Sequence, residues 1–296
     1  MKKVLIVGGV AAGASAATRL RRLDEHIQIV MFERGEHISF ANCGLPYYIG
    51  DVISDREKLL VATPKLMEDR FNIDVRTSSE VTKINIHEKK VTITSKDKGI
   101  YEETYDYLVL APGAKPIRPN IPGVNSSRIF TLRNVNDTDL IKAKVQGIQN
   151  AVVIGGGYIG VEMAENLRMK QIETTIVEAA PHILAPFDDD MVVVAERKLR
   201  DNGIKLILNN GVSAFNELEN EVEIVLQSGD RITADCVILA VGVAPDTGFL
   251  KDSGIELSAK GHILVNNKME TNIEGVYAGG DAVEVIDFVN GTQTAI

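Results

Sequence analysis

Residues 3–17 read KVLIVGGVAAGASAA, and this stretch decides the fold because its pattern returns later in the chain. Residues 150–164 read NAVVIGGGYIGVEMA, so each copy has a short apolar run, a glycine-rich turn and a helix-forming segment. Each copy then leads to a second apolar run that ends in an acid, Glu33 in the first and Glu178 in the second. A strand, a glycine turn, a helix and a distant acid form the fingerprint of a dinucleotide-binding unit. The sequence therefore predicts two such units.

The glycine turns predict where phosphates bind, because glycine permits a tight turn and a close approach of the backbone to a pyrophosphate at a helix N-terminus. The second turn is complete, whereas in the first Val10 stands at the middle glycine position. There the close approach has to rely on Gly9 and its small neighbours. The acids are expected to bind ribose hydroxyls. The predicted binding residues are Gly8, Gly9, Ala11, Ala12, Gly13 and Glu33 in the first copy, and Gly155, Gly157, Gly160 and Glu178 in the second.

The duplication extends to a later apolar run in each copy, YLVLAPG at 107–113 and CVILAVG at 236–242. Alternating residues at 81–95 and at 221–234 predict a small antiparallel hairpin in each half. Prolines near residue 116 and at residue 245 indicate where the chain crosses between halves. We therefore expect an α/β chain with two doubly wound, Rossmann-like domains, the second inserted in the first. The predicted boundaries are residues 1–115 and 246–296 for the first domain and residues 116–245 for the second.

Composition excludes several classes of protein. The 41 acidic and 32 basic residues give a net charge of −9, which disfavours nucleic acid as a partner. No stretch reaches the roughly 18 consecutive apolar residues of a membrane span, and the first apolar run stops at Gly8, too early for a signal peptide. Two cysteines cannot build a disulfide framework, so we expect a reducing, cytoplasmic location.

Three neighbouring acids, Asp188 to Asp190, have the composition of a metal cluster. They precede a segment that is expected to be helical as far as Arg200, and acids are favoured at the start of a helix by its dipole. We therefore expect no metal site.

Three further segments carry a resemblance to a known family. They read SFANCGLPYY at 39–48, LAPGA at 110–114 and GVYAGGD at 275–281. With the two glycine turns, they make the whole chain similar to the flavin-dependent pyridine nucleotide–disulfide oxidoreductases, and the single cysteine resembles most the coenzyme A-disulfide reductase branch. The resemblance implies FAD on the first domain, with Glu33 on the adenosine ribose and Asp281 on the ribityl chain, and NAD(P)H on the second. It also implies cofactor contacts by Arg34, Asn42, Val81, Ala111, Gly113, Tyr158, Ile159, Gly242 and Gly280.

Cys43 is the candidate catalytic residue. A lone cysteine is usually a small buried hydrophobe, and this describes Cys236, which begins an apolar strand. Cys43 instead stands among Asn, Gly and Pro, and the positive end of a helix that begins near Pro46 would favour its thiolate. The fifth residue after Cys43 is Tyr48, so no internal disulfide can form at the spacing of a two-cysteine reductase. Its oxidised form must be a mixed disulfide, a persulfide or a sulfenic acid.

A substrate site is predicted on the first helix. Ser15, Arg19 and Arg22 recur at i, i+4 and i+7, and so share one face. Such a stripe is as often a solvated surface as a binding site. The resemblance implies that these positions, with Ser39 and Asn42, line a coenzyme A site in which the two arginines hold phosphates.

The second domain is expected to prefer NADH, although NADPH remains possible. Glu178 would accept a hydrogen bond from a free 2′-hydroxyl and repel a 2′-phosphate, and Ala179 and Ala180 supply no compensating arginine. Tyr158 either lies where the nicotinamide stacks, as the resemblance implies, or is a packing residue of the turn.

The predicted activity is reduction of a disulfide, most specifically coenzyme A disulfide or a related low-molecular-weight disulfide, by NAD(P)H through FAD and Cys43. The alternatives are an NADH oxidase or peroxidase that forms a Cys43 sulfenic acid, a coenzyme A persulfide or polysulfide reductase, and a flavin redox sensor or inactive fragment without turnover. Family members continue into a dimerisation domain, whereas this sequence ends 15 residues after Asp281. We therefore expect a truncated form of a homodimeric protein.

Overall fold

The computed structural model describes residues 2–295 and divides by its internal contacts into two compact units. The first unit comprises Met1–Phe40, Leu60–Lys115 and Ala244–Ile296, and the second comprises Ala41–Leu59 and Pro116–Val243. The chain crosses between them near β8 (Ala114–Pro116) and β17 (Val243–Pro245).

A five-stranded sheet forms the centre of the first unit, in the order β19-β7-β1-β2-β3, and each neighbouring pair is parallel. These strands are β1 (Lys3–Val7), β2 (Gln28–Phe32), β3 (Asp74–Arg76), β7 (Tyr107–Leu110) and β19 (Val276–Ala278). Helices α1 (Ala11–Leu23) and α3 (Pro64–Phe71) pack on one face, where Ala14 and Met67 join the buried cluster that contains Val4 and Ile6. Alternate residues of β1 thus pack against helices, as a doubly wound sheet requires.

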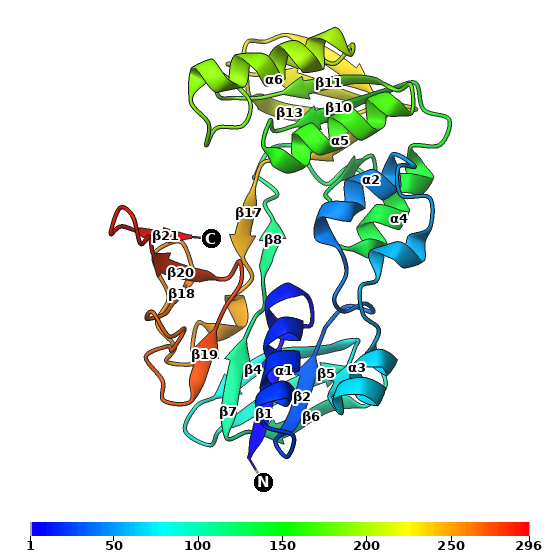
Figure 1. The fold of residues 1–296 in the computed structure, drawn as a ribbon. Coiled ribbons are helices and arrows are strands. Elements are labelled where there is room, and N and C mark those ends of the chain that lie inside the picture. The colour runs from blue at the N-terminus through cyan, green and yellow to red at the C-terminus, as the bar shows by residue number, and fades with distance from the viewer. Residues whose placement is uncertain (1, 296) are drawn as a thin grey trace. The chain divides into compact units, whose positions relative to one another are not determined.

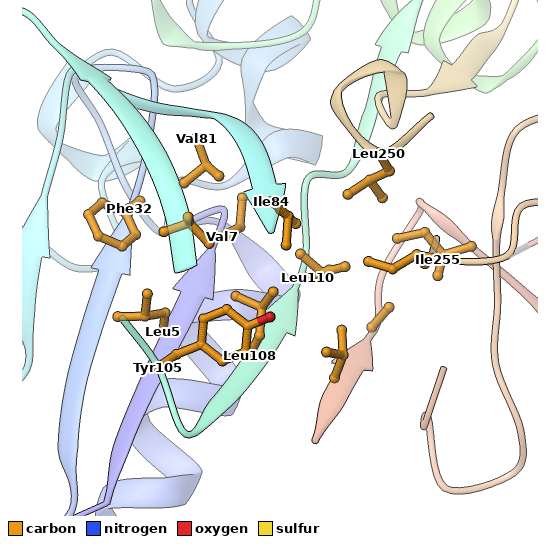
Figure 2. Packing of buried hydrophobic residues seen from close by; sticks show 14 of the residues in the cluster. Leu5, Val7, Phe32, Val81, Ile84, Tyr105, Leu108, Leu110, Leu250 and Ile255 are labelled. Atoms are coloured by element: carbon orange, nitrogen blue, oxygen red, sulfur yellow. The ribbon is translucent and has the colours of Figure 1, made fainter. Parts of the chain in front are cut away.

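The other face of this sheet carries an antiparallel sheet in the order β4-β5-β6. Its strands are β4 (Ser79–Asn85), β5 (Lys90–Ser95) and β6 (Gly99–Thr104). Figure 2 shows Val81 and Ile84 of β4 in the same apolar cluster as Leu5 and Val7 of β1. The rest of the unit consists of η3 (Gly248–Leu250) and a small sheet of β18 (Ile263–Leu264), β20 (Val283–Ile286) and β21 (Gln293–Ala295).

The second unit repeats this plan with a parallel sheet in the order β12-β11-β10-β16-β9. Its strands are β9 (Ile129–Phe130), β10 (Asn150–Ile154), β11 (Glu173–Val177), β12 (Lys205–Ile207) and β16 (Cys236–Leu239). Its helices are α4 (Val135–Lys144), α5 (Tyr158–Met169) and α6 (Asp189–Asp201). An antiparallel sheet of β13 (Val212–Glu217), β14 (Val222–Leu226) and β15 (Arg231–Ala234) shares its core. The predicted fold class is therefore confirmed, and each antiparallel excursion has three strands where the alternating pattern indicated two.

Residues 41–59 belong by their contacts to the second unit, whereas the sequence analysis placed them in the first domain. They form η1 (Asn42–Gly44), α2 (Leu45–Ile49) and η2 (Arg56–Leu59). The reason is that α2 packs against α4 and α5 (Figure 1). The predicted cysteine thus lies on a segment that is built into the second unit.

No helix in the described part of the chain is both long enough and apolar enough to cross a membrane.

Candidate functional site

The first glycine turn lies at the carboxyl edge of the parallel sheet, directly after β1. Gly8 has a φ of +98°, and a Cβ there would lie 2.0 Å from the carbonyl oxygen of Ala111 at the end of β7. A Cβ on Gly13 would lie 1.8 Å from the oxygen of Gly8. No other residue fits these two positions, so the turn and the start of α1 are pressed together as a pyrophosphate site requires.

Glu33 is held beside this turn by two backbone N–H groups. Its Oε2 accepts a hydrogen bond from Gly9 N at 2.9 Å and its Oε1 accepts one from Gly35 N at 2.8 Å. Each carboxylate oxygen can accept more than one hydrogen bond, so ribose hydroxyls can still be bound. The predicted carboxylate is therefore fixed next to the predicted phosphate turn.

The second turn has the same construction. Gly155 has a φ of +106°, and its Cβ would lie 2.3 Å from the oxygen of Ala240. Glu178 accepts hydrogen bonds from Gly156 N at 2.6 Å and from Ala180 N at 2.7 Å. A Cβ on Gly157 would meet nothing within 4 Å, so the backbone at the start of α5 is open to an approaching group.

The segment after β19 returns to the first turn within the first unit. Gly279 N donates to the oxygen of Leu110 at 3.0 Å, and a Cβ on Gly280 would lie 3.0 Å from the Cβ of Ala12 in α1. The predicted partners Gly280, Asp281, Ala11 and Ala12 are thus brought together although about 270 residues separate them in the sequence.

Three predicted cofactor residues have more specific surroundings. Arg34 forms an ion pair with Asp246, which also lies 3.1 Å from Lys115. Burial alone would raise the pKa of Asp246, but these two cations hold it below its usual range. Val81 is 5% exposed in the core, so its side chain is closed to a ligand. Gly113 has a φ of +69° directly before β8.

Tyr158 and Ile159 are exposed at the first turn of α5, beside the second glycine turn. The Tyr158 ring meets Phe187 edge to face at a centroid distance of 6.2 Å. Phe187 lies in the loop that follows Glu178, and the sequence analysis did not select it. Its only signal was an aromatic residue between that acid and the next helix.

Cys43 is exposed in η1, the short helical turn that precedes α2. Its neighbour Asn42 has a buried Oδ1 without a hydrogen-bond partner among residues 2–295. Cys236 is buried at the start of β16, and burial raises the pKa of its thiol to about 12. A substrate can therefore reach the sulfur of Cys43, whereas Cys236 is both buried and held as the neutral thiol. Because α2 has only five residues, the expected help from a helix dipole is small.

Tyr47 is a further candidate that the sequence analysis missed. It follows Cys43 by four residues, about one helical turn. Its pKa is raised, chiefly by the charge of Glu162 and then by burial, with smaller contributions from Glu165 and Cys43. A raised pKa leaves the phenol protonated near neutral pH, as it is in an ordinary tyrosine, and a proton donor needs that state.

The three residues of the predicted substrate face lie on α1. Ser15, Arg19 and Arg22 are all exposed, and within the described residues neither guanidinium has an ion-pair partner. Arg21 differs, because it donates to the carbonyl oxygens of Phe71 and Asn72 and holds α1 on α3.

Ser39 and Asn42, the other two predicted substrate residues, fall in different units. Ser39 lies at the first glycine turn and donates from its N–H to the oxygen of Gly9 at 2.9 Å. Asn42 belongs to the second unit.

Gly242, a predicted cofactor residue, follows β16 with a φ of +106°.

The three acids at 188–190 lie at the start of α6, and Asp189 contacts His182 at 3.1 Å. Across residues 2–295, no group of three or more His, Cys, Asp or Glu side chains could hold a metal ion.

Comparison with known proteins places these features in a family. The family model described as pyridine nucleotide-disulphide oxidoreductase matches residues 2–295. Coenzyme A disulfide reductase of Staphylococcus epidermidis is 38% identical over 286 residues, which cover 96% of this chain and 64% of that protein. The reduced CoADR-RHD of Bacillus anthracis superposes with a TM-score of 0.96 at 50% identity, covering all of this chain and 53% of that one. An NAD-dependent persulfide reductase of A. fulgidus gives 0.95 at 33% identity, covering 99% and 56%.

The chain thus spans a little under two thirds of the length of the curated relative and about half of the two solved chains. The match of the family model nevertheless includes both glycine turns, their acids and the Cys43 segment. This chain belongs to the pyridine nucleotide-disulphide oxidoreductase family.

Proposed function

We propose that this chain is the nucleotide-binding part of an NAD(P)H-dependent flavoprotein that reduces a disulfide, with FAD on the first unit and NAD(P)H on the second. The observation that carries the proposal is an exposed Cys43 in a chain that has two dinucleotide turns and a second cysteine buried out of reach. One cofactor can donate electrons and the other can pass them to a thiol only if both are bound to the same protein.

The first unit fits FAD by its construction. The turn at Gly8, Gly9 and Gly13 packs so closely on neighbouring protein atoms that no Cβ fits, and the Glu33 carboxylate is fixed beside it for a ribose. Asp281 follows the Gly280 loop that packs on α1. Bound FAD would supply a two-electron relay between the pyridine nucleotide and sulfur chemistry.

Cys43 would act as the nucleophile toward the disulfide. Its thiolate attacks one sulfur of coenzyme A disulfide, so a bond from Cys43 to one half forms while the substrate S–S bond breaks. The other half leaves as a thiolate and takes up one proton. Two electrons that come from NADH and a second proton then release the bound half and restore the Cys43 thiolate. The sum is disulfide, NADH and one proton going to two thiols and NAD⁺.

Coenzyme A disulfide is the acceptor that we favour, and two observations support it. A curated relative named for this substrate shares 38% identity over most of the chain. The exposed face of α1 carries Arg19 and Arg22 without ion-pair partners among the described residues, and guanidinium groups pair well with phosphates such as those of coenzyme A. We further propose a cytoplasmic homodimer for the active protein.

Other acceptors fit the same cysteine. Persulfide or polysulfide reduction is supported by the likeness to the A. fulgidus persulfide reductase. Reduction of oxygen or peroxide would need a Cys43 sulfenic acid, which the exposure of the thiol permits. A flavin sensor without turnover is the remaining alternative.

A single preparation of the flavin-loaded protein separates these acceptors. We expect kcat/KM for coenzyme A disulfide to exceed that for coenzyme A persulfide, hydrogen peroxide or oxygen by about tenfold or more. The reason is that only the disulfide carries two coenzyme A groups that the protein can bind. The rates are followed as loss of NADH absorbance together with thiol release. A higher rate with persulfide or peroxide would identify that compound, and not coenzyme A disulfide, as the acceptor. If NADH is oxidised with none of the four, the flavin sensor without turnover is favoured.

Glu178 gives a prediction about the choice of nucleotide. The pair of substitutions Glu178→Gln and Ala179→Arg is expected to raise kcat/KM for NADPH relative to NADH by about 100-fold, because it removes a repelling charge and adds a phosphate-binding cation. The glutamine oxygen can still accept one of the two backbone hydrogen bonds that Glu178 receives, so the turn is preserved.

Glu173→Gln is the matched control, since Glu173 is an exposed acid at the opposite end of the same strand, β11. It is expected to leave the NADPH/NADH ratio within twofold of the parent. An unchanged ratio in the double variant would show that Glu178 does not face the ribose.

A further inference from the structure

The segment that carries Cys43 is fastened to the second unit by an ionic cluster. Asp51, just after α2, accepts hydrogen bonds from the ammonium groups of Lys142 on α4 and of Lys170 at the end of α5, one on each carboxylate oxygen. The two lysines come from different helices, and they lie 91 and 119 residues away from Asp51 in the sequence. One carboxylate thus joins the Cys43 segment to both helices on which it packs.

Lys142 makes two more contacts with the same segment. Its ammonium donates to the carbonyl oxygen of Tyr48 and lies 4.0 Å from the centre of the Tyr48 ring. Tyr48 is the penultimate residue of α2. The carbonyl groups in the last turn of a helix lack intrahelical partners, so the cation also satisfies the C-terminus of α2.

Two neighbouring contacts complete the fastening. Arg56 in η2 donates from Nε to both carboxylate oxygens of Asp139 on α4, at 3.1 and 2.9 Å. Gly50 packs so closely on α5 that a Cβ there would lie 2.2 Å from Oδ1 of the buried Asn166. The segment is therefore held on the second unit at four positions between Tyr48 and Arg56.

The two cations that bind Asp51 are partly buried. The Lys142 and Lys170 side chains are only 20% and 14% exposed, and the hydrogen bonds from these two groups hold the pKa of Asp51 below its usual range. The Asp51 carboxylate itself is 54% exposed, so the cost of losing it comes from the two partly buried cations that are left without their counter-charge. Without the Asp51 charge, both ammonium groups would lose the carboxylate that they share.

We propose that Asp51 is a positioning residue for Cys43, which fixes the cysteine segment on α4 and α5 so that its thiol meets the disulfide in one geometry. This inference rests on the proposed role of Cys43. Displacing a reacting group by about 1 Å can cost up to 100-fold in rate, so a fastening that lies eight residues from the thiol can control turnover.

Asp51→Asn tests the proposal, because asparagine tolerates the φ of +63° at this position and removes only the charge. In the flavin-loaded protein we expect kcat for disulfide reduction to fall about tenfold, while NADH-dependent ferricyanide reduction stays within twofold. Amide hydrogen exchange in residues 44–51 should become at least about tenfold faster, with the remaining amides unchanged. A general loss of stability would instead affect both activities and exchange throughout the chain.

Lys170→Met provides a second route to the same cluster, since methionine keeps most of the apolar stem. The double variant of Asp51→Asn and Lys170→Met should be no slower than the slower of the two single variants, because both changes remove the same interaction.

Glu57→Gln is the control: its carboxylate lies in the same segment but is 73% exposed and lies 3.9 Å from Arg56. It should leave both activities and hydrogen exchange unaltered.

The result that overturns the proposal is hydrogen exchange in residues 44–51 and a disulfide kcat that both match the parent in Asp51→Asn. That outcome is distinct from failure of the proposed function, which Cys43→Ser tests on its own. If Cys43→Ser retains turnover while Asp51→Asn loosens the segment, then the fastening is real but Cys43 is not the nucleophile.

Discussion

Replacing Cys43 with serine is expected to lower disulfide turnover by at least about 10³-fold, because a serine hydroxyl is not ionised near neutral pH and cannot take part in thiol–disulfide exchange. The change replaces only the sulfur atom by oxygen. Because Cys43 is exposed in η1, no core packing is lost. NADH-dependent ferricyanide reduction needs the two nucleotide sites and not the thiol, so it should stay within about twofold of the parent. Both rates are measured on the same flavin-loaded preparation.

Cys236→Ala is the appropriate control for the loss of a thiol. Cys236 is fully buried at the start of β16, and burial raises its pKa to about 12, so it cannot supply a thiolate at neutral pH. We expect this variant to keep its disulfide turnover and to lose about 1–2 kcal/mol of folding free energy through the small cavity that it leaves. Disulfide turnover that survives in Cys43→Ser but vanishes in Cys236→Ala would reverse the assignment.

The two nucleotide units could be predicted because their requirements are local. The close contact of Gly8 with Ala111 and that of Gly155 with Ala240 both demand glycine, so the sequence displays the turns directly. The acids Glu33 and Glu178 end apolar strands and bind backbone N–H groups of their own turns. A pattern of neighbouring residues is sufficient to recognise such a construction.

The placement of residues 41–59 could not be predicted in the same way. It depends on Asp51, Lys142 and Lys170, which are distant in sequence and are ordinary surface charges when viewed singly. From the sequence alone, the segment therefore groups with the strand that precedes it. The environment of Tyr47 could not be predicted for a related reason. Its neighbour Glu162 lies on α5, and only the packing of α2 on α5 brings the two residues near each other.

The third strand of each antiparallel sheet was missed because neither has a clear alternation. Strand β6 reads GIYEET, with every residue exposed or half-buried, at the edge of its sheet. Strand β13 reads VSAFNE and contains a bulge near Val212. Edge strands have little need of an apolar face, so their sequences resemble loops.

Alanine substitutions at Gly8 and Gly155 are expected to abolish different halves of the reaction. Either Cβ would come within 2.3 Å of a backbone oxygen, so the turn has to open and the phosphate cradle is lost. Gly8→Ala should be purified without flavin, with affinity for FAD lowered by at least about 100-fold. Gly155→Ala should retain FAD but have a KM for NADH raised by at least about 100-fold.

The controls separate loss of space from backbone strain. Gly99 in the first unit and Gly229 in the second also have positive φ values, +68° and +93°, yet a Cβ on either would meet nothing within 4 Å. Alanine there carries the same kind of left-handed strain, about 1–2 kcal/mol. Both controls should bind FAD and NADH as the parent does, and far-ultraviolet circular dichroism should show all four variants folded.

The pattern of the two losses decides which nucleotide each unit binds. FAD content is read from the visible absorbance of the purified protein, and NADH binding from the rate of flavin bleaching under anaerobic conditions, with dithionite as the reductant that needs no NADH site. If Gly155→Ala loses flavin and Gly8→Ala keeps it, the cofactors occupy the opposite units. If dithionite fails to bleach Gly155→Ala, its defect lies in the flavin environment rather than in the nicotinamide site. FAD on the first turn and NADH on the second require that Gly155→Ala is no longer bleached by NADH but is still bleached by dithionite.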